Sequence, residues 1–329
     1  MKRRQLLIAI GAGSLYASLP HLAGAQNRPV RIGFLATRAQ PAVWNADYYG
    51  AFLRGMRDLH YVEGKDFAME WRFANGDSER LPELASDLVQ SKVDIIVTGG
   101  TPAIRAAKQA TTTIPIVMAN SNDPVGAGFI ASMSNPGGNI TGLANTNTGL
   151  SPTHMSLMQE VLPGLSRVAV LLNPKNDNYT PILKSMHEAA AKMRIKIVRL
   201  EAKSSREIDG AFAAMDRAEA QAVITAFDAL YVQQRHQIGA LALKYRLPSL
   251  FPVRQQVEAG GLMSYGQNFG KLYRRAAVYV DRILKGAKPA DLPVEQATKF
   301  ELVINNRIAR ALALDIPASV RQRADKVIG

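Results

Sequence analysis

A stretch at 94–108 constrains the fold of this chain more than any other. It opens with the largely β-branched run Asp-Ile-Ile-Val-Thr at 94–98, continues with two glycines, and enters a helical pattern at Thr101-Pro102. Glycines permit a sharp turn, and threonine before proline is typical of a helix start, with Thr101 as the N-cap. The stretch predicts a strand, a tight turn and a helix. Its first-turn N–H groups could bind an anion, or it could be an ordinary βα turn.

The same alternation of strands and helices runs along the chain and starts again near its middle. Strands are expected in the first half at 30–36, 66–73, 94–98, 114–119 and 139–143. A second series is expected at 167–172, 196–200, 222–226, 247–251 and 261–264. Alternating units of this kind form parallel sheets with helices on both faces. The predicted fold class is therefore α/β, with two doubly wound parallel-sheet lobes.

The late elements are too few for a third domain. They comprise an amphipathic helix at 269–284, a strand at 300–304 and a closing helix at 307–314. We expect them to cross back between the two sheets.

The first 25 residues have the features of an export signal. A positive start at Lys2-Arg3-Arg4 precedes an apolar run at 6–19 and the small-residue cleavage site Ala23-Gly24-Ala25. The arginine pair also fits a twin-arginine signal, so both export routes stay open. The chain has no cysteine, which excludes disulfides, thiolate chemistry and a lipid-anchoring thiol. These features predict a periplasmic protein without a lipid anchor, cleaved near Ala25.

Charge and motifs exclude several classes of function. The formal net charge is +13, but beyond the first residues lysines and arginines are spread along the chain, without a basic run that would read nucleic acid. The chain contains no H-x-x-x-H, G-x-S-x-G or phosphate-loop motif, so we expect no metal and no cofactor. Asp123 and Asp228 could act as paired carboxylates, which leaves a secreted hydrolase or isomerase as the alternative to a binding protein.

Two sheets that face each other leave a cleft at the carboxyl ends of their strands. A zwitterionic amino acid needs hydrogen-bond donors for its carboxylate and an acceptor for its ammonium group. The turn at 98–103 could supply the donors and Asp228 the acceptor. Trp44, Tyr48 and Tyr231 could supply aromatic walls. Each has a structural alternative: Asp228 could cap a helix, Trp44 could pack in a loop, and Tyr48 could belong to the core.

Polar loops are expected to converge on this cleft at 37–44, 98–101, 119–123, 173–179 and 227–231. The residues that we expect to bind the ligand are Thr37, Trp44, Tyr48, Thr98, Gly100, Thr101, Pro102, Ala103, Asn122, Asp123, Asn178, Tyr179, Asp228 and Tyr231.

Many segments, in order, resemble one known family, the substrate-binding proteins of ABC importers that include tryptophan- and tyrosine-binding members. The resemblance covers residues 30–328. The matching segments are Tyr61-Val-Glu-Gly-Lys65, Arg80-Leu-Pro82, Val97-Thr-Gly-Gly-Thr-Pro102, Thr113-Ile-Pro-Ile-Val117, Asp123-Pro-Val-Gly126, Asn135-Pro-Gly-Gly-Asn-Ile-Thr-Gly142, Glu258-Ala-Gly-Gly-Leu-Met-Ser-Tyr-Gly266 and Lys285-Gly-Ala-Lys-Pro-Ala-Asp-Leu-Pro-Val-Glu-Gln296.

The resemblance implies a type I periplasmic binding-protein fold, in which two lobes joined by a three-segment hinge close on a small ligand. The lobes would be 26–145 plus 266–297 and 146–265 plus 298–329. The implied partners are a membrane permease and its ATPase.

By position, Thr101, Pro102 and Ala103 match the family's carboxylate-binding helix start, Asp123 the adjacent loop, and Asp228 the acid of the facing lobe. An aromatic or branched amino acid is the favoured ligand. A sugar, a nucleoside or an aromatic acid is the alternative.

Overall fold

Buried β-branched and aliphatic runs build a first sheet of six strands, in the order β11-β5-β4-β3-β1-β2. These strands are β1 (Val30–Ala36), β2 (Phe67–Phe73), β3 (Ile95–Gly99), β4 (Ile116–Asn122), β5 (Ile140–Asn145) and β11 (Glu295–Gln296). All of their pairings are parallel. The central strands are apolar on both sides because helices cover both faces of the sheet.

The second sheet has seven strands, in the order β13-β12-β10-β9-β8-β6-β7. They are β6 (Arg167–Leu172), β7 (Lys196–Glu201), β8 (Ala222–Thr225), β9 (Ser249–Phe251), β10 (Met263–Gln267), β12 (Phe300–Asn305) and β13 (Lys326–Ile328). Only the β10–β12 pairing is antiparallel among those described. The predicted fold class, with two sheets dominated by parallel strands, is confirmed.

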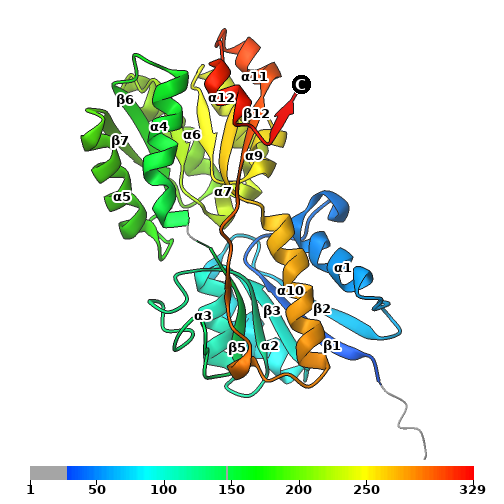
Figure 1. Cartoon of the computed structure of the whole chain (residues 1–329). Helices are drawn as coiled ribbons and strands as arrows, with labels where there is room; N and C mark the ends of the chain where they lie inside the picture. The colour runs from blue at the N-terminus through cyan, green and yellow to red at the C-terminus, as the bar shows by residue number, and fades with distance from the viewer. Residues whose placement is uncertain (1–27, 146) are drawn as a thin grey trace, which may run out of the picture.

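Helices flank each sheet in this computed structural model, which describes residues 28–145 and 147–329 (Figure 1). The first lobe, defined by the six-stranded sheet, carries η1 (Trp44–Ala46), α1 (Tyr48–Asp58), η2 (Ser78–Arg80), α2 (Leu81–Gln90), α3 (Thr101–Ala110), α10 (Phe269–Leu284) and η4 (Pro289–Asp291). The second lobe carries η3 (Asn147–Leu150), α4 (Ser151–Val161), α5 (Tyr179–Lys192), α6 (Ser205–Arg217), α7 (Ala229–Gln233), α8 (Arg235–Lys244), α9 (Arg254–Glu258), α11 (Asn306–Ala311) and α12 (Ala318–Gln322).

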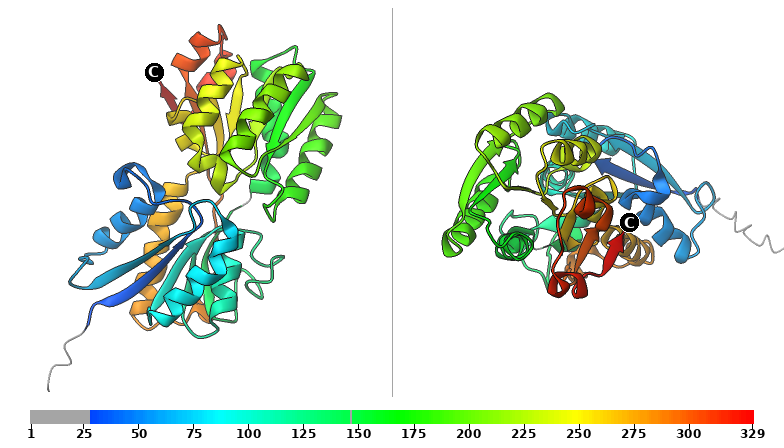
Figure 2. Two further views of the ribbon diagram at one scale, coloured as in Figure 1. Left: turned by 180° about the vertical axis from the view of Figure 1, so that it is seen from behind. Right: turned by 90° about the horizontal axis from the view of Figure 1, so that it is seen from above.

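The late helix α10 returns to the first lobe and lies along α1, as Figures 1 and 2 show. Close packing is possible because α1 has glycine at position 55, where an added Cβ would lie 2.5 Å from the carbonyl oxygen of Arg274. The helix spans the residues that its apolar pattern predicts, Phe269–Leu284. It contributes the buried aromatic rings Phe269, Tyr273 and Tyr279 to the first lobe's core.

The chain passes between the lobes three times: after β5, after β10 and before β12. Asn268 lies at the second passage, where its side chain accepts from the N–H of Lys271 and donates to Glu301 at 2.9 Å. This bond ties the second passage to the third.

The predicted lobe boundaries stay a prediction, with one difference in sheet membership. Residues Gly266 and Gln267, assigned to the first lobe, pair with β12 in the second sheet because β10 continues to Gln267. The predicted export signal at 1–25 lies outside the described residues. Within them, no helix combines the length and apolarity needed to cross a bilayer, and no cluster of His, Asp or Glu has the makings of a metal site.

Candidate functional site

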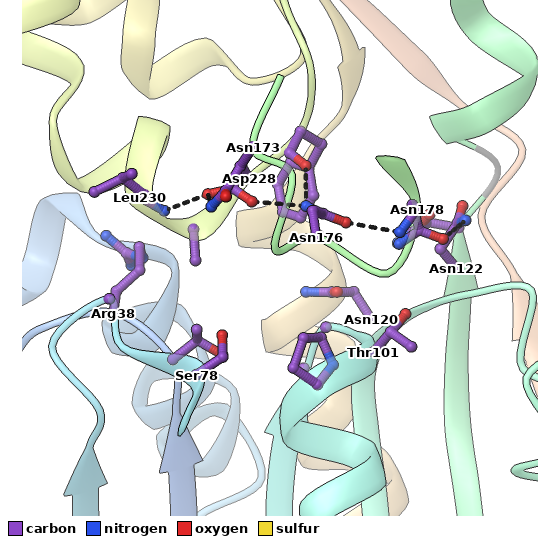
Figure 3. Close-up of a pocket in the computed structure, with 18 of the residues that line it drawn as sticks. Arg38, Ser78, Thr101, Asn120, Asn122, Asn173, Asn176, Asn178, Asp228 and Leu230 are labelled. Atoms are coloured by element: carbon purple, nitrogen blue, oxygen red, sulfur yellow. Dashed lines mark hydrogen bonds between the residues drawn. The ribbon is translucent and has the colours of Figure 1, made fainter. Parts of the chain in front are cut away.

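A cleft lies between the lobes where loops from both sheets meet, with about 770 Å³ of space between protein atoms, part of it open to solvent. Figure 3 shows its first-lobe side, with Arg38, Ser78 and Thr101, facing Asp228 and Asn176 of the second lobe. The predicted site residues that line it are Thr37, Tyr48, Gly100, Thr101, Pro102, Asn122, Asn178 and Asp228.

The start of α3 forms one part of the first-lobe wall. Gly100 occupies the N-cap position with φ 86° and ψ 140°, a conformation that favours glycine. The prediction that Thr101 is the N-cap is wrong: Thr101 is already helical, so its side chain does not bond the N–H groups of the first turn. Its hydroxyl is instead buried without a hydrogen-bond partner, in a residue that is only 5% exposed.

The end of β4 adds two asparagines to this wall. Asn120 and Asn122 fall on the same side of the strand because side chains alternate along it. The amide nitrogen of Asn120 donates to the hydroxyl of Tyr273 at 3.3 Å, and that of Asn122 donates to Asn178 in the second lobe at 2.9 Å. The amide oxygens of both are buried without a partner. Such oxygens are suited to N–H donors of a bound molecule.

A buried ion pair stands beside them. The guanidinium of Arg38 donates to both carboxylate oxygens of Asp47 at 2.8 and 2.9 Å, and Arg38 is only 3% exposed. The guanidinium lies 4.2 Å from the ring centre of Tyr48 and 4.6 Å from that of Tyr49. Tyr48 therefore belongs to the first lobe's core and also lines the cleft, so both of its expected roles fit its position.

Asp228 is the centre of the second-lobe wall, and it is only 6% exposed. Its carboxylate caps α7 by accepting from the N–H of Leu230 at 2.9 Å, as its structural alternative expects. It also accepts from the amides of Asn176 at 2.7 Å and Asn173 at 3.2 Å. Burial raises the pKa of this carboxyl, while the hydrogen bonds from Asn176 and Asn173 act in the opposite direction.

The loop that supplies these amides is held by its own side chains. The oxygen of Asn173 accepts from the N–H of Lys175 at 3.0 Å, and that of Asn176 accepts from the N–H of Asn178 at 2.9 Å. Asparagine favours such local turns because its side chain bonds the backbone two residues on. The loop is thereby fixed before any ligand arrives.

Six predicted site residues do not line the cleft. Trp44 packs edge-on against Trp71, with ring centres 4.6 Å apart, which is the loop packing considered as its alternative. The hydroxyl of Thr98 is buried and donates to the carbonyl oxygen of Leu35 at 2.9 Å. Ala103 is fully buried in the core.

The other three also point elsewhere. Asp123 accepts from the N–H of Gly126 at 2.9 Å in an exposed turn. The hydroxyl of Tyr179 donates to the carboxylate of Glu201 at the surface. Tyr231 is fully buried, and its hydroxyl donates to a backbone carbonyl oxygen. Because Asp123 is absent from the cleft that Asp228 lines, the two carboxylates do not form a joint catalytic pair in this structure.

Several lining residues were not named individually in the sequence analysis, although most of them lie in loops that it expected at the cleft. The alternation of side chains along β4 could have added Asn120 to Asn122, and the asparagine-rich loop could have added Asn173 and Asn176. Tyr273 had no such signal, since it reaches the cleft from α10. The remaining lining residues that were not predicted are Arg38, Tyr49, Gly76, Ser78, Gly99, Asn145, Lys175, Phe227, Ala229 and Leu230.

The chain is similar to known proteins both in sequence and in structure. A family described as ABC transporter substrate binding protein matches residues 41–328. A tyrosine-binding protein of Clostridioides difficile strain R20291 is 26% identical over 261 residues, which cover 79% of this chain and 75% of that protein.

Two solved structures are also similar. An ABC domain from Streptococcus pneumoniae in complex with L-Trp is 25% identical, with a TM-score of 0.82, over 92% of this chain and 100% of that one. A conserved domain protein from Vibrio cholerae is 28% identical, with a TM-score of 0.83, over 91% of this chain and 100% of that one.

Proposed function

We propose that this chain, which belongs to the ABC transporter substrate-binding protein family, carries a free aromatic amino acid in the cleft between its lobes. The observation that carries the proposal is the polarity of the two walls. A helix start and the unpartnered Thr101 hydroxyl face a buried carboxylate, Asp228, across one cleft. The names of relatives support the ligand class, since one is a tyrosine-binding protein and another holds L-Trp.

The head group of an amino acid fits both walls. Its carboxylate would accept from the N–H groups at the start of α3 and from the hydroxyl of Thr101. Its ammonium group would donate to Asp228 and to the free oxygens of Asn120 and Asn122. Asp228 accepts from the amides of Asn173 and Asn176 and from the N–H of Leu230, and none of these donors is a cation that would neutralise the carboxylate.

Aromatic rings from both lobes supply the remaining wall. Tyr48 and Tyr273 of the first lobe line the cleft with ring centres 4.7 Å apart. Phe227 of the second lobe stacks on Phe269 at 4.8 Å, and it lines the same cleft. Flat apolar faces of this kind suit an aromatic side chain.

A sugar is the second candidate, because six asparagines line the cleft and amides pair well with hydroxyl groups. They are Asn120, Asn122, Asn145, Asn173, Asn176 and Asn178. Asn173 and Asn176 already bond Asp228, however, and a neutral sugar would leave that carboxylate without a cation. The amino acid is therefore the first choice.

The biological setting follows from the same proposal. The protein is exported to the periplasm, closes on its cargo, and delivers it to a permease driven by an ATPase. It binds its ligand without chemical turnover.

The test is a thermal-shift screen of the refolded mature protein against amino acids, aromatic acids, sugars and nucleosides. A ligand at about a hundred times its Kd adds about 2.7 kcal/mol of stability, which raises Tm by several degrees. We expect shifts with L-tyrosine or L-tryptophan and none with neutral sugars. Shifts confined to sugars would refute the amino-acid proposal. Recovery of the positive ligand unaltered after long incubation separates binding from a hydrolase or isomerase.

A further inference from the structure

Polar contacts of two kinds join the lobes across the mouth of the cleft. At the exposed rim, Arg105 pairs with Asp177 at 3.1 Å, and Glu79 pairs with Lys175. Asn122 and Asn178 both line the cleft itself, and the amide nitrogen of Asn122 lies 2.9 Å from the side-chain oxygen of Asn178. Figure 3 shows the two side chains next to each other. The rim pairs are surface ion pairs, whereas the amide pair belongs to the wall that a ligand would touch.

Asn122 has two ends with different partners. Its amide nitrogen donates to the side-chain oxygen of Asn178, while its own oxygen is buried with no partner. The residue is held in place because it is the last residue of β4 and is paired with Asn145 on β5. A bond from the nitrogen to the opposite lobe fixes the plane of the amide, and the oxygen then stays in a defined place as a buried acceptor.

On the other side of the cleft, the hydrogen bonds continue to the carboxylate. The backbone N–H of Asn178 donates to the side chain of Asn176 at 2.9 Å, and Asn176 donates to Asp228 at 2.7 Å. Figure 3 shows this row of bonds from Asn178 to the N–H of Leu230, with Asn122 next to Asn178. A single row of polar groups therefore links the first-lobe wall to the proposed ammonium site in the second lobe.

We propose that Asn122 couples ligand binding to lobe closure through its bond to Asn178. Closure orients the amide so that its oxygen accepts from the ligand, and a ligand on that oxygen turns the nitrogen toward Asn178. Each event favours the other, because both require the same orientation of one amide. This inference rests on the proposed function, since the ammonium group of an amino acid is the donor that the oxygen requires.

The experiment uses L-tyrosine as the probe and measures both affinity and closure. The natural chain has no cysteine, so Glu83→Cys on α2 and His187→Cys on α5, both at exposed positions, give one dye site per lobe for energy transfer. A double-mutant cycle is built from Asn122→Ala, Asn178→Ala and the variant that carries both changes. Arg105→Gln, which breaks a rim pair outside the cleft, is the matched control.

We expect Asn178→Ala to weaken tyrosine binding about five-fold, the effect of one net hydrogen bond, and to lower the closed fraction at saturation. Asn122→Ala should weaken binding further, because it removes the ligand contact as well. The double variant should match Asn122→Ala alone, since Asn178 no longer has its partner. Arg105→Gln should change the affinity less than two-fold.

Additive effects in the cycle, or full closure of Asn178→Ala with unchanged affinity, would overturn the inference. If the wild-type protein binds neither L-tyrosine nor L-tryptophan, the proposed function fails. The closed fractions of the unliganded variants then test whether the Asn122–Asn178 bond supports closure. A lower closed fraction in Asn178→Ala than in Arg105→Gln supports a role of the Asn122–Asn178 bond in closure, whereas equal fractions reject it.

Discussion

The two walls of the cleft satisfy their polar groups in different ways. On the first-lobe wall, the Thr101 hydroxyl and the amide oxygens of Asn120 and Asn122 are buried without partners. On the second-lobe wall, the carboxylate of Asp228 accepts from two asparagines and a backbone N–H. A buried polar group left unpaired costs about 1–3 kcal/mol, so the first wall stores a cost that a ligand can relieve.

Substitutions on the two walls should therefore affect ligand affinity and stability differently. The unpartnered groups of the first wall can gain hydrogen bonds from a ligand, so polar side chains removed there should affect affinity more than stability. The second wall is already a folded network that includes the cap of α7, so its side chains should affect both quantities. The following changes test that distinction.

Asp228→Asn should produce the largest loss of affinity. Asparagine can still cap α7, so the fold should persist while the ligand ammonium loses its counter-charge. Removing one partner of a buried charge pair costs about 2–5 kcal/mol, which calorimetric titration with the cargo would detect as a large increase in Kd. An unchanged Kd would mean that the ammonium lies elsewhere and that Asp228 serves the network alone.

The same carboxyl should make both stability and affinity depend on pH. Burial raises the pKa of the Asp228 carboxyl above its ordinary value of 3.8. Protonation of this carboxyl therefore stabilises the folded, unliganded protein. That contribution to stability is present below the unfolded pKa and is lost as pH rises through the folded pKa. Ligand affinity should change in the opposite direction and weaken as pH falls through the folded pKa. Tm and Kd measured against pH should lose these two trends in Asp228→Asn.

Gly100→Ala tests whether the first wall depends on its backbone. The residue has φ 86° and ψ 140°, and an added Cβ would meet no atom within 4 Å, so the expected cost is conformational. Such strain amounts to about 1–3 kcal/mol, and it should lower Tm and displace the start of α3 from the ligand. Gly210→Ala in α6 has open space and no positive φ, so it should raise Tm instead. A similar rise in Gly100→Ala would contradict the conformational argument.

Two neighbouring threonines give the most direct comparison within the first wall. Thr101→Val should weaken binding by about 1 kcal/mol and should not lower Tm of the unliganded protein, because the hydroxyl has no partner before the ligand arrives and its removal takes away an unpaired buried group. Thr98→Val should do the reverse, since its hydroxyl donates to the carbonyl oxygen of Leu35 and lies outside the cleft. A lower Tm in Thr101→Val would show that this hydroxyl supports the helix.

The sequence predicts those parts of the molecule that follow from local periodicity. The apolar stripe of α10 defines both ends of that helix, and the alternating units predict the two sheets. The direction of individual side chains at strand ends is harder to infer, because one residue reverses the face of a strand. Thr98 was expected in the cleft as part of the turn at 98–103, yet its side chain points into the lobe. Tyr231 lies in α7, and its hydroxyl also turns from the cleft that Asp228 lines.

Residues that reach the cleft through tertiary packing had no local signal at all. Tyr273 lies on α10, which follows most elements of the second lobe in the sequence. Arg38 lies in the loop at 37–44 that was expected at the cleft, but its pairing with Asp47 depends on how α1 packs. Local patterns therefore indicate which loops meet, whereas packing decides which atoms face the ligand.

The smallest expected effect concerns the rim, and it tests whether the walls or the surface hold the lobes together. Arg105 and Asp177 are both exposed, and pairs of this kind contribute about 0.2–1 kcal/mol. Salt at about 1 M shortens the screening length to about 3 Å, so it should weaken closure slightly in the wild type and less in Arg105→Gln. The neutral amides of Asn122 and Asn178 carry no net charge, and their bond should persist at that salt concentration. If salt opened the liganded protein completely in the energy-transfer assay, surface charge would hold the lobes together, and the contrast between the two walls would not explain closure.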